Sequence, residues 1–179
     1  MKRKISCFIV FIILMLLPFN TFVVNANPQI TETTPYGPKS SDLKGKDALI
    51  KNLNDIKKVR ENLVTINISE TSTNEELDKA YTELESYLQQ ITLYKRTLLQ
   101  HQIDYKDSFA DVFFADKVSL IANSYIVSIR MQQNLIRQLR EGKLDAKTLF
   151  YSDYQIPVYY YLTLGDQTYS YIETYLVTD

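Results

Sequence analysis

The chain has 179 residues, with 20 basic and 21 acidic side chains and a net charge of −1. This near balance argues against a nucleic-acid-binding protein, which needs clustered positive charge to hold phosphates. Only four glycines are present, too few for the tight turns of a sandwich or barrel of many short strands. Tryptophan is absent, whereas tyrosine is abundant, with 14 residues. Together these features predict one domain of long helices with few connections.

The first 26 residues have the pattern of an export signal. Lys2, Arg3 and Lys4 form a basic head, an apolar run from Ile5 to Leu17 follows, and a small-residue cleavage site ends at Ala26. We expect cleavage after Ala26, so that the protein is secreted or associated with the envelope outside the cytoplasm. The alternative is an uncleaved N-terminal membrane anchor, because the apolar stretch approaches the length that spans a bilayer.

Cleavage at this site would change the chemistry of the remaining chain. It would leave 153 residues, enough for one domain with a hydrophobic core. Loss of the three basic residues of the head lowers the basic count from 20 to 17, against 21 acidic residues, for a net charge of −4. It would also remove Cys7, the only cysteine, so packing alone would stabilise the mature chain. Cys7 stands near the start of the apolar run and not at the cleavage junction, which disfavours a lipid anchor.

Residues 27–41 are rich in proline, serine and threonine and predict a flexible leader before a single helical domain over 42–179. We expect the first helix of this domain to begin near Ser41 or Asp42, since either side chain can cap the free N–H groups of an opening turn. Apolar side chains then recur on one face, at Leu49, Leu53, Ile56 and Leu63.

Two overlapping capping boxes mark the start of a second helix. In one Ser72 pairs with Glu75, and in the other Thr73 pairs with Glu76. We expect this helix to reach about residues 101–105. Its apolar residues follow a heptad-like rhythm, typical of a coiled-coil seam packed against other helices, at Leu77, Tyr81, Leu84, Leu88, Ile91 and Leu98.

A third helix is predicted from about Ser108 to Glu141, and Gly142 supplies a left-handed residue after its last turn. No glycine or proline separates this helix from the second one, so the break at residues 104–108 is inferred from their polarity and from helix length. An unbroken helix of about 65 residues would be unusual in a chain of this size. A continuous helix is the alternative.

The last segment, residues 144–179, is compatible with two structures. Its tyrosine-rich runs on either side of Gly165 and Asp166 fit a β-hairpin. The same segment also places residues on one helical seam, at Val158, Leu162, Gly165, Tyr169, Ile172 and Leu176. Pro157 suits the first turn of such a helix, and three preceding helices need a partner to cover their apolar faces.

We therefore expect an all-α fold, as an up-down four-helix bundle or a long helical hairpin with extra helices. Three helices followed by a C-terminal β-hairpin are the alternative.

The residues of common catalytic sites are missing. His101 is the only histidine, which excludes a multi-histidine metal site, and no cysteine lies outside the predicted signal. The chain contains no GxGxxG, P-loop or GxSxG motif. We therefore expect neither catalysis nor a cofactor.

A weak candidate for a metal or acid–base site lies between the second and third helices. Its members are His101, Asp104, Asp107 and Asp111. On one continuous helix their spacings would align them on one side, as a hard metal ion requires. The competing interpretation is structural, because Asp107 or Ser108 can cap the third helix and Asp111 lies in its first turn. A break in the chain at this point would remove the alignment, so we assign no metal ligand.

Positive charge gathers near the end of the third helix. The residues are Arg130, Arg137, Arg140, Lys143 and Lys147. They could bind an anionic surface such as phospholipid headgroups or an envelope polymer. The alternative is that these charges pair within the bundle or are simply solvated, since cations favour a helix C-terminus and the last segment offers acidic neighbours. Those neighbours are Asp153, Asp166, Glu173 and Asp179.

The tyrosine-rich last segment is the best candidate for a binding surface. Three consecutive tyrosines on a helix point in three directions, so they cannot all enter one core. Tyrosine is enriched at protein interfaces because its ring adds apolar contact while its hydroxyl stays hydrogen-bonded. The candidate interface residues are Tyr159, Tyr160, Tyr161, Tyr171 and Tyr175. The alternative is that these rings fill the rim of a wide core.

The sequence thus predicts a small exported helical bundle without catalysis that acts through a protein partner or self-association. A membrane- or polymer-binding module is the second hypothesis, and a metal-dependent enzyme is the third.

Overall fold

The computed structural model describes residues 37–63, 71–142, 148 and 154–174. The chain divides into two units, Met1–Glu32 and Thr33–Asp179, and all of the described residues belong to the second. The predicted export signal, its cleavage site and most of the predicted leader lie outside the described residues.

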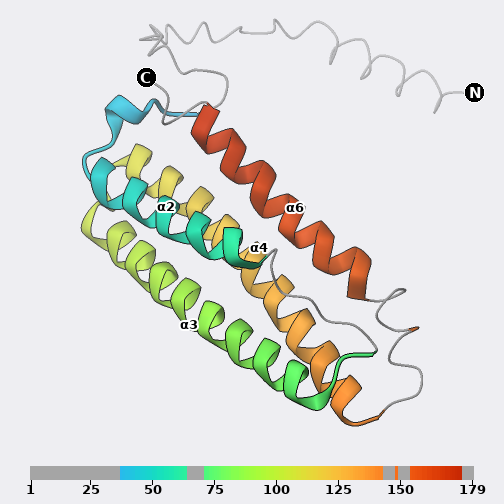
Figure 1. Ribbon diagram of the computed structural model, residues 1–179. Helices are drawn as coiled ribbons and strands as arrows, with labels where there is room; N and C mark the ends of the chain where they lie inside the picture. Colours follow the sequence, from blue (N-terminus) through green and yellow to red (C-terminus); the bar gives the residue numbers. More distant parts are fainter. Residues whose placement is uncertain (1–36, 64–70, 143–147, 149–153, 175–179) are drawn as a thin grey trace, which may run out of the picture. The chain divides into compact units, whose positions relative to one another are not determined.

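Four α-helices make up most of the described chain, together with a short 3-10 helix, η1 (Ser40–Asp42) (Figure 1). The α-helices are α2 (Lys46–Leu63), α3 (Asn74–Asp104), α4 (Phe109–Arg140) and α6 (Gln155–Ile172). The described residues form no β-strand. The predicted all-α helical bundle is confirmed.

Polar contacts show that neighbouring helices run in alternating directions. Along α3 and α4, Gln102 Nε2 donates to Asp116, Gln133 Nε2 donates to Glu85, and Arg140 pairs with Asp78. From one pair to the next the residue number falls along α3 and rises along α4, so the two helices are antiparallel. The hydrogen bonds Tyr125–Asp166 and Asn134–Tyr154 show that α4 and α6 are antiparallel as well, and Gly45, just before α2, lies beside His101 and Tyr105 at the end of α3. The four helices therefore follow an up-down order (Figure 1).

Helix α4 is the centre of the bundle, because α2, α3 and α6 all pack against it. Among the described helices it alone has the length and composition of a membrane span, with a mean hydropathy of 1.4 over 18 residues. More than half of that window, 56%, is buried inside the bundle. A core helix has this composition because its partners cover it on several sides.

The core follows the apolar periodicity of the sequence. Leu77, Leu84, Ile91 and Leu98 recur every seven residues along α3 and are at most 3% exposed. They meet a broad apolar face of α4 that includes Phe114, Val118, Ile121, Ile129 and Ile136. Four of the six residues of the predicted seam of α3 are therefore buried, and the other two, Tyr81 and Leu88, are half-buried and pack against the core.

Local signals set both ends of α3 and α4. Thr73 caps α3 with Glu76, whose carboxylate accepts the Thr73 N–H at 2.7 Å. Ser108 caps α4, and Gly142 follows α4 with a φ of 65°. The break between the two helices is confirmed, and a continuous helix is wrong, because Tyr105 ends α3 and Ser108 opens α4.

The segment around Gly165 is a helix, and the β-hairpin alternative is wrong. Val158, Leu162, Gly165 and Ile172 form the buried side of α6, as the seam predicted. Pro157 stands in the first turn of α6, where its missing N–H has no helical partner to lose. Leu176 lies outside the described residues.

The predicted start of the first helix is wrong. Asp42 accepts the Lys39 N–H at 3.1 Å and so caps the start of η1. Helix α2 begins only at Lys46. The backbone N–H groups of Lys44 and Gly45, which precede α2, donate instead to the carboxylate of Asp111 in α4. A residue 66 positions away therefore supplies the anchor that a local cap was expected to supply.

Candidate functional site

The Asp111 carboxylate joins three parts of the chain at one end of the bundle. It accepts the N–H of Lys44 at 3.0 Å, the N–H of Gly45 at 2.9 Å and the hydroxyl of Ser108 at 2.5 Å. His101 Nε2 lies 3.0 Å from the same carboxylate. Asp111 is fully buried and His101 is 5% exposed. We call these five residues the Asp111 junction.

The structure separates the candidate metal or acid–base residues. His101 and Asp111 come together, but Asp104 and Asp107 are exposed, and Asp104 accepts a hydrogen bond from Gln100. Within the described residues no three His, Cys, Asp or Glu side chains gather to hold a metal ion. The contacts of Asp111 are those of a structural anchor, since four groups of the chain already surround its two oxygens.

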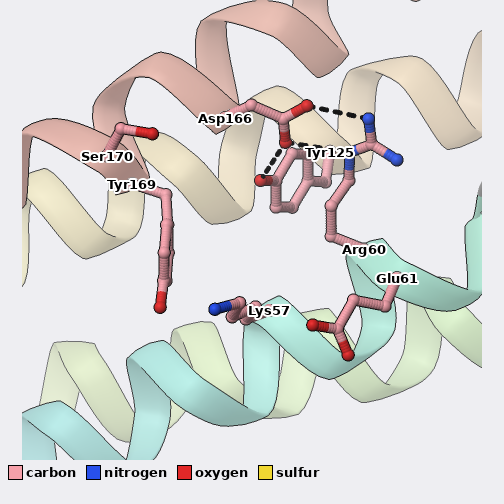
Figure 2. A pocket seen from close by; sticks show the side chains of 7 residues that line it. All are labelled: Lys57, Arg60, Glu61, Tyr125, Asp166, Tyr169 and Ser170. Carbon is pink, nitrogen blue, oxygen red and sulfur yellow. Dashed lines mark hydrogen bonds and ion pairs between the residues drawn. The ribbon is translucent and has the colours of Figure 1, made fainter. Parts of the chain in front are cut away.

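A hollow of about 340 Å³ opens between α2, α4 and α6 (Figure 2). Its lining residues are Lys57, Arg60, Glu61, Tyr125, Asp166, Tyr169 and Ser170. Arg60 donates to Asp166 through Nε at 2.9 Å and through Nη2 at 2.8 Å, and the hydroxyl of Tyr125 donates to the same carboxylate at 2.8 Å. These paired groups hold α6 to α2 and α4, so they offer no free nucleophile or base to a substrate.

Tyr125 at the back of the hollow is 1% exposed. Burial raises the pKa of its phenol well above the ordinary value, and the hydrogen bond and negative charge of Asp166 raise it further. A raised pKa means that the folded state prefers the neutral phenol. The resulting stability is complete below about pH 10 and declines as the pH rises past that value.

We expect the Tyr125 phenol to stay neutral at a pH at which a free tyrosine ionises. In tyrosine 13Cζ NMR spectra recorded between about pH 9 and 12, the Tyr125 resonance should keep its neutral shift until the protein unfolds. Tyr125→Phe should remove this resonance and so assigns it. A Tyr125 signal that moves as that of a free phenol does, near pH 10, would contradict the contacts described above.

The outer face of α6 differs from the rest of the surface. Six residues of this helix are exposed, and they follow one stripe along its full length. They are Ile156, Tyr159, Tyr160, Thr163, Gln167 and Ser170. We call them the α6 stripe. None of them is charged, and the only charged residue of α6, Asp166, turns its carboxylate toward Arg60 and Tyr125 (Figure 2).

Charge is abundant on the exposed residues of the other three helices. Lys51, Lys58 and Glu61 are exposed on α2, and Glu75, Lys79 and Arg96 are exposed on α3. On α4 the exposed stripe includes Asp116, Arg130 and Arg137. Among the described helices, α6 is the one on which no exposed residue is charged, whereas the exposed residues of α3 between Thr82 and Ile103 include one charged residue, Arg96.

The predicted tyrosine surface is therefore present in part. Tyr159 and Tyr160 are each 60% exposed. Tyr161 is half-buried, and its ring meets that of Tyr160 edge to face at 5.3 Å. Tyr171 is half-buried as well, and Tyr175 lies outside the described residues. Ile156, which no sequence pattern singled out, is 71% exposed and stands one helical turn before the tyrosines.

The predicted basic group at the end of α4 is not a continuous patch of free charge. Arg130 and Arg137 are exposed, but Arg140 pairs with Asp78 of α3 at 2.8 Å. Lys143 and Lys147 lie outside the described residues.

Arg140 thus pairs within the bundle, but its partner comes from α3 and not from the last segment, and the two acidic residues of that segment that the structure describes have partners on α2. Asp166 pairs with Arg60 of α2, and Glu173 lies 3.8 Å from Lys57 of α2. The antiparallel packing of α6 on α4 explains this result, because it brings Asp166 level with Tyr125, far from the end of α4. Asp153 and Asp179 lie outside the described residues.

The chain offers no guide to its function beyond these sites. Comparison with family models, curated proteins and solved structures finds no match. Two groups of large apolar side chains are exposed near each other in the described chain: Ile156, Tyr159 and Tyr160 on α6, and Ile103 and Phe109 at the turn between α3 and α4. The α6 group belongs to a helix on which no exposed residue is charged, whereas Asp104, Lys106 and Asp107 are exposed around the other group.

Proposed function

We propose that this protein is a non-catalytic helical bundle that binds a protein partner through the α6 stripe. One observation carries the proposal. Ile156, Tyr159 and Tyr160 are 71%, 60% and 60% exposed, lie within one helical turn of each other, and belong to a stripe without charge. The proposed site of action, outside the cytoplasm or at the cell envelope, rests on the export pattern of residues 1–26.

The composition of the stripe favours a protein partner. The buried centre of a protein interface is depleted of charged residues and enriched in tyrosine. Covering a large apolar side chain completely contributes about 1.5–3 kcal/mol, and tyrosine is among the residues that dominate binding energy. A surface that only faces water gains nothing from this arrangement, since charged side chains would keep it better hydrated.

A photo-cross-linking residue tests this proposal in the producing cells. We expect p-benzoylphenylalanine at position 160 to yield a covalent protein adduct on irradiation, with Tyr160 replaced. The same residue in place of Thr97, which is exposed on α3, is the matched control and should yield none. The measurement is the mass of the adduct on a denaturing gel, followed by mass spectrometry.

Equal yields at the two positions, or no adduct at position 160, would count against binding through the α6 stripe. An adduct at position 160 remains informative whatever its mass, because it reports the partner directly.

A further inference from the structure

We infer that the partner bound by the α6 stripe is a second copy of this chain, with the two α6 helices packed antiparallel. This inference rests on the proposed function and adds the identity of the partner. It would make the protein a two-fold symmetric dimer whose interface is centred on Thr163.

Side-chain size changes from one half of the stripe to the other. The N-terminal half carries Ile156, Tyr159 and Tyr160, whereas the C-terminal half carries the smaller Thr163 and Ser170, with Gln167 between them. Two antiparallel copies centred on position 163 place position 156 opposite position 170, and position 159 opposite position 167. Each large half then packs on the small half of the other copy. A parallel pair would instead crowd tyrosine against tyrosine at one end and leave small side chains facing each other at the other.

Charge also favours pairing with an identical copy. A two-fold interface brings the same surface together twice, so like charges in it repel each other. The α6 stripe avoids this penalty because none of its six residues is charged. Antiparallel α6 helices also bring the positive end of each helix dipole near the negative end of the other.

The first test measures the mass of the protein in solution. The gene for the full chain, with Cys7→Ser, is expressed in the producing cells, and the protein is purified as these cells process it. We expect it to sediment as a dimer at micromolar concentration. Thr163→Lys would place two ammonium groups at the two-fold axis and should weaken dimerisation at least about tenfold. Thr97→Lys makes the same chemical change at an exposed position of α3 and should leave the dimer intact. Circular dichroism should show unchanged helix content for both variants.

The second test determines the face and the register. With Cys7 replaced, an introduced cysteine is the only thiol in the chain. Thr163→Cys should form an intermolecular disulfide on mild oxidation, and Thr97→Cys should not, because a disulfide needs Cβ atoms about 3.5–4.5 Å apart. Mixed Ile156→Cys and Ser170→Cys chains should cross-link to each other, whereas each variant alone should not.

The possible failures are distinguishable. A monomer at every concentration would overturn the inference, and so would a dimer that survives Thr163→Lys. Cross-linking of Ile156→Cys chains to themselves would overturn the antiparallel register. If the protein is a monomer but photo-cross-linking at position 160 captures a different protein, the proposed function stands and the second copy is excluded. If neither experiment yields a partner, both proposals fail.

Discussion

Asp111→Ala is expected to destabilise the bundle by about 3–5 kcal/mol, the range for a buried charged network that loses one member. The substitution removes both acceptor oxygens of the Asp111 junction. It leaves the N–H groups of Lys44 and Gly45, the hydroxyl of Ser108 and one nitrogen of His101 without their observed partner. Buried donors without a partner each cost about 1–3 kcal/mol, so the start of α2 should detach first.

Urea unfolding followed by circular dichroism measures this effect. Asp116→Ala is the matched control, because Asp116 is also in α4 and also accepts a hydrogen bond, from Gln102, but is exposed. We expect the control to lose less than about 1 kcal/mol. Equal losses for the two variants would show that the Asp111 junction does not anchor α2.

The same junction predicts how stability depends on acid. Burial would raise the pKa of Asp111, but hydrogen bonds from Ser108, from the N–H groups of Lys44 and Gly45, and from His101 outweigh it, so its pKa lies below the ordinary value. A lowered pKa favours the ionised carboxylate in the folded state. The stability it gives is complete above about pH 4 and is lost as the pH falls through the folded pKa. Asp111→Asn should therefore remove part of the acid dependence of the urea midpoint between about pH 4 and 2.

Local patterns in the sequence were enough to predict most of the fold. The capping box at Thr73 and Glu76 and the seven-residue spacing of α3 are short-range signals, and the structure follows both. The spacing of the apolar seam also correctly predicted that α6 is a helix and not a hairpin. The start of α2 could not be predicted in this way, because its anchor, Asp111, lies 66 positions further along the chain.

At the candidate site, too, the local features could be predicted from the sequence and the long-range contacts could not. Three consecutive tyrosines on a helix had to point in different directions, which predicted that some would be exposed, and Tyr159 and Tyr160 are. The pair of Arg60 and Asp166 spans 106 positions, and no periodicity connects them. Gly165 was the one sequence signal that α6 packs closely on a neighbouring helix. A glycine on the buried seam of a helix indicates that another element comes close.

That close approach makes Gly165→Ala the second large effect that we expect. A Cβ atom at position 165 would lie 2.3 Å from Cε1 of Tyr125 and 2.9 Å from Cδ1 and Cζ. In a free helix, alanine is more stable than glycine by about 1 kcal/mol. Here the ring cannot move aside easily, because it is 1% exposed and its hydroxyl is bound to Asp166. We expect the clash to prevail and the variant to lose about 1–3 kcal/mol, as overpacked cores do.

A double-mutant cycle in urea separates the clash from any other effect of the substitution. Tyr125→Leu removes the ring, so Gly165→Ala should become neutral or stabilising in that background, with a coupling energy of at least about 1 kcal/mol. Tyr125→Phe keeps the ring and should give no such relief. Thr97→Ala, at an exposed position of α3 outside the proposed interface, should change stability by less than about 0.5 kcal/mol. If Gly165→Ala is harmless in the wild-type chain, α6 does not pack on Tyr125 as closely as described. The side of α6 opposite Gly165 would then no longer be identified as its outer face, and the α6 stripe would lose that support.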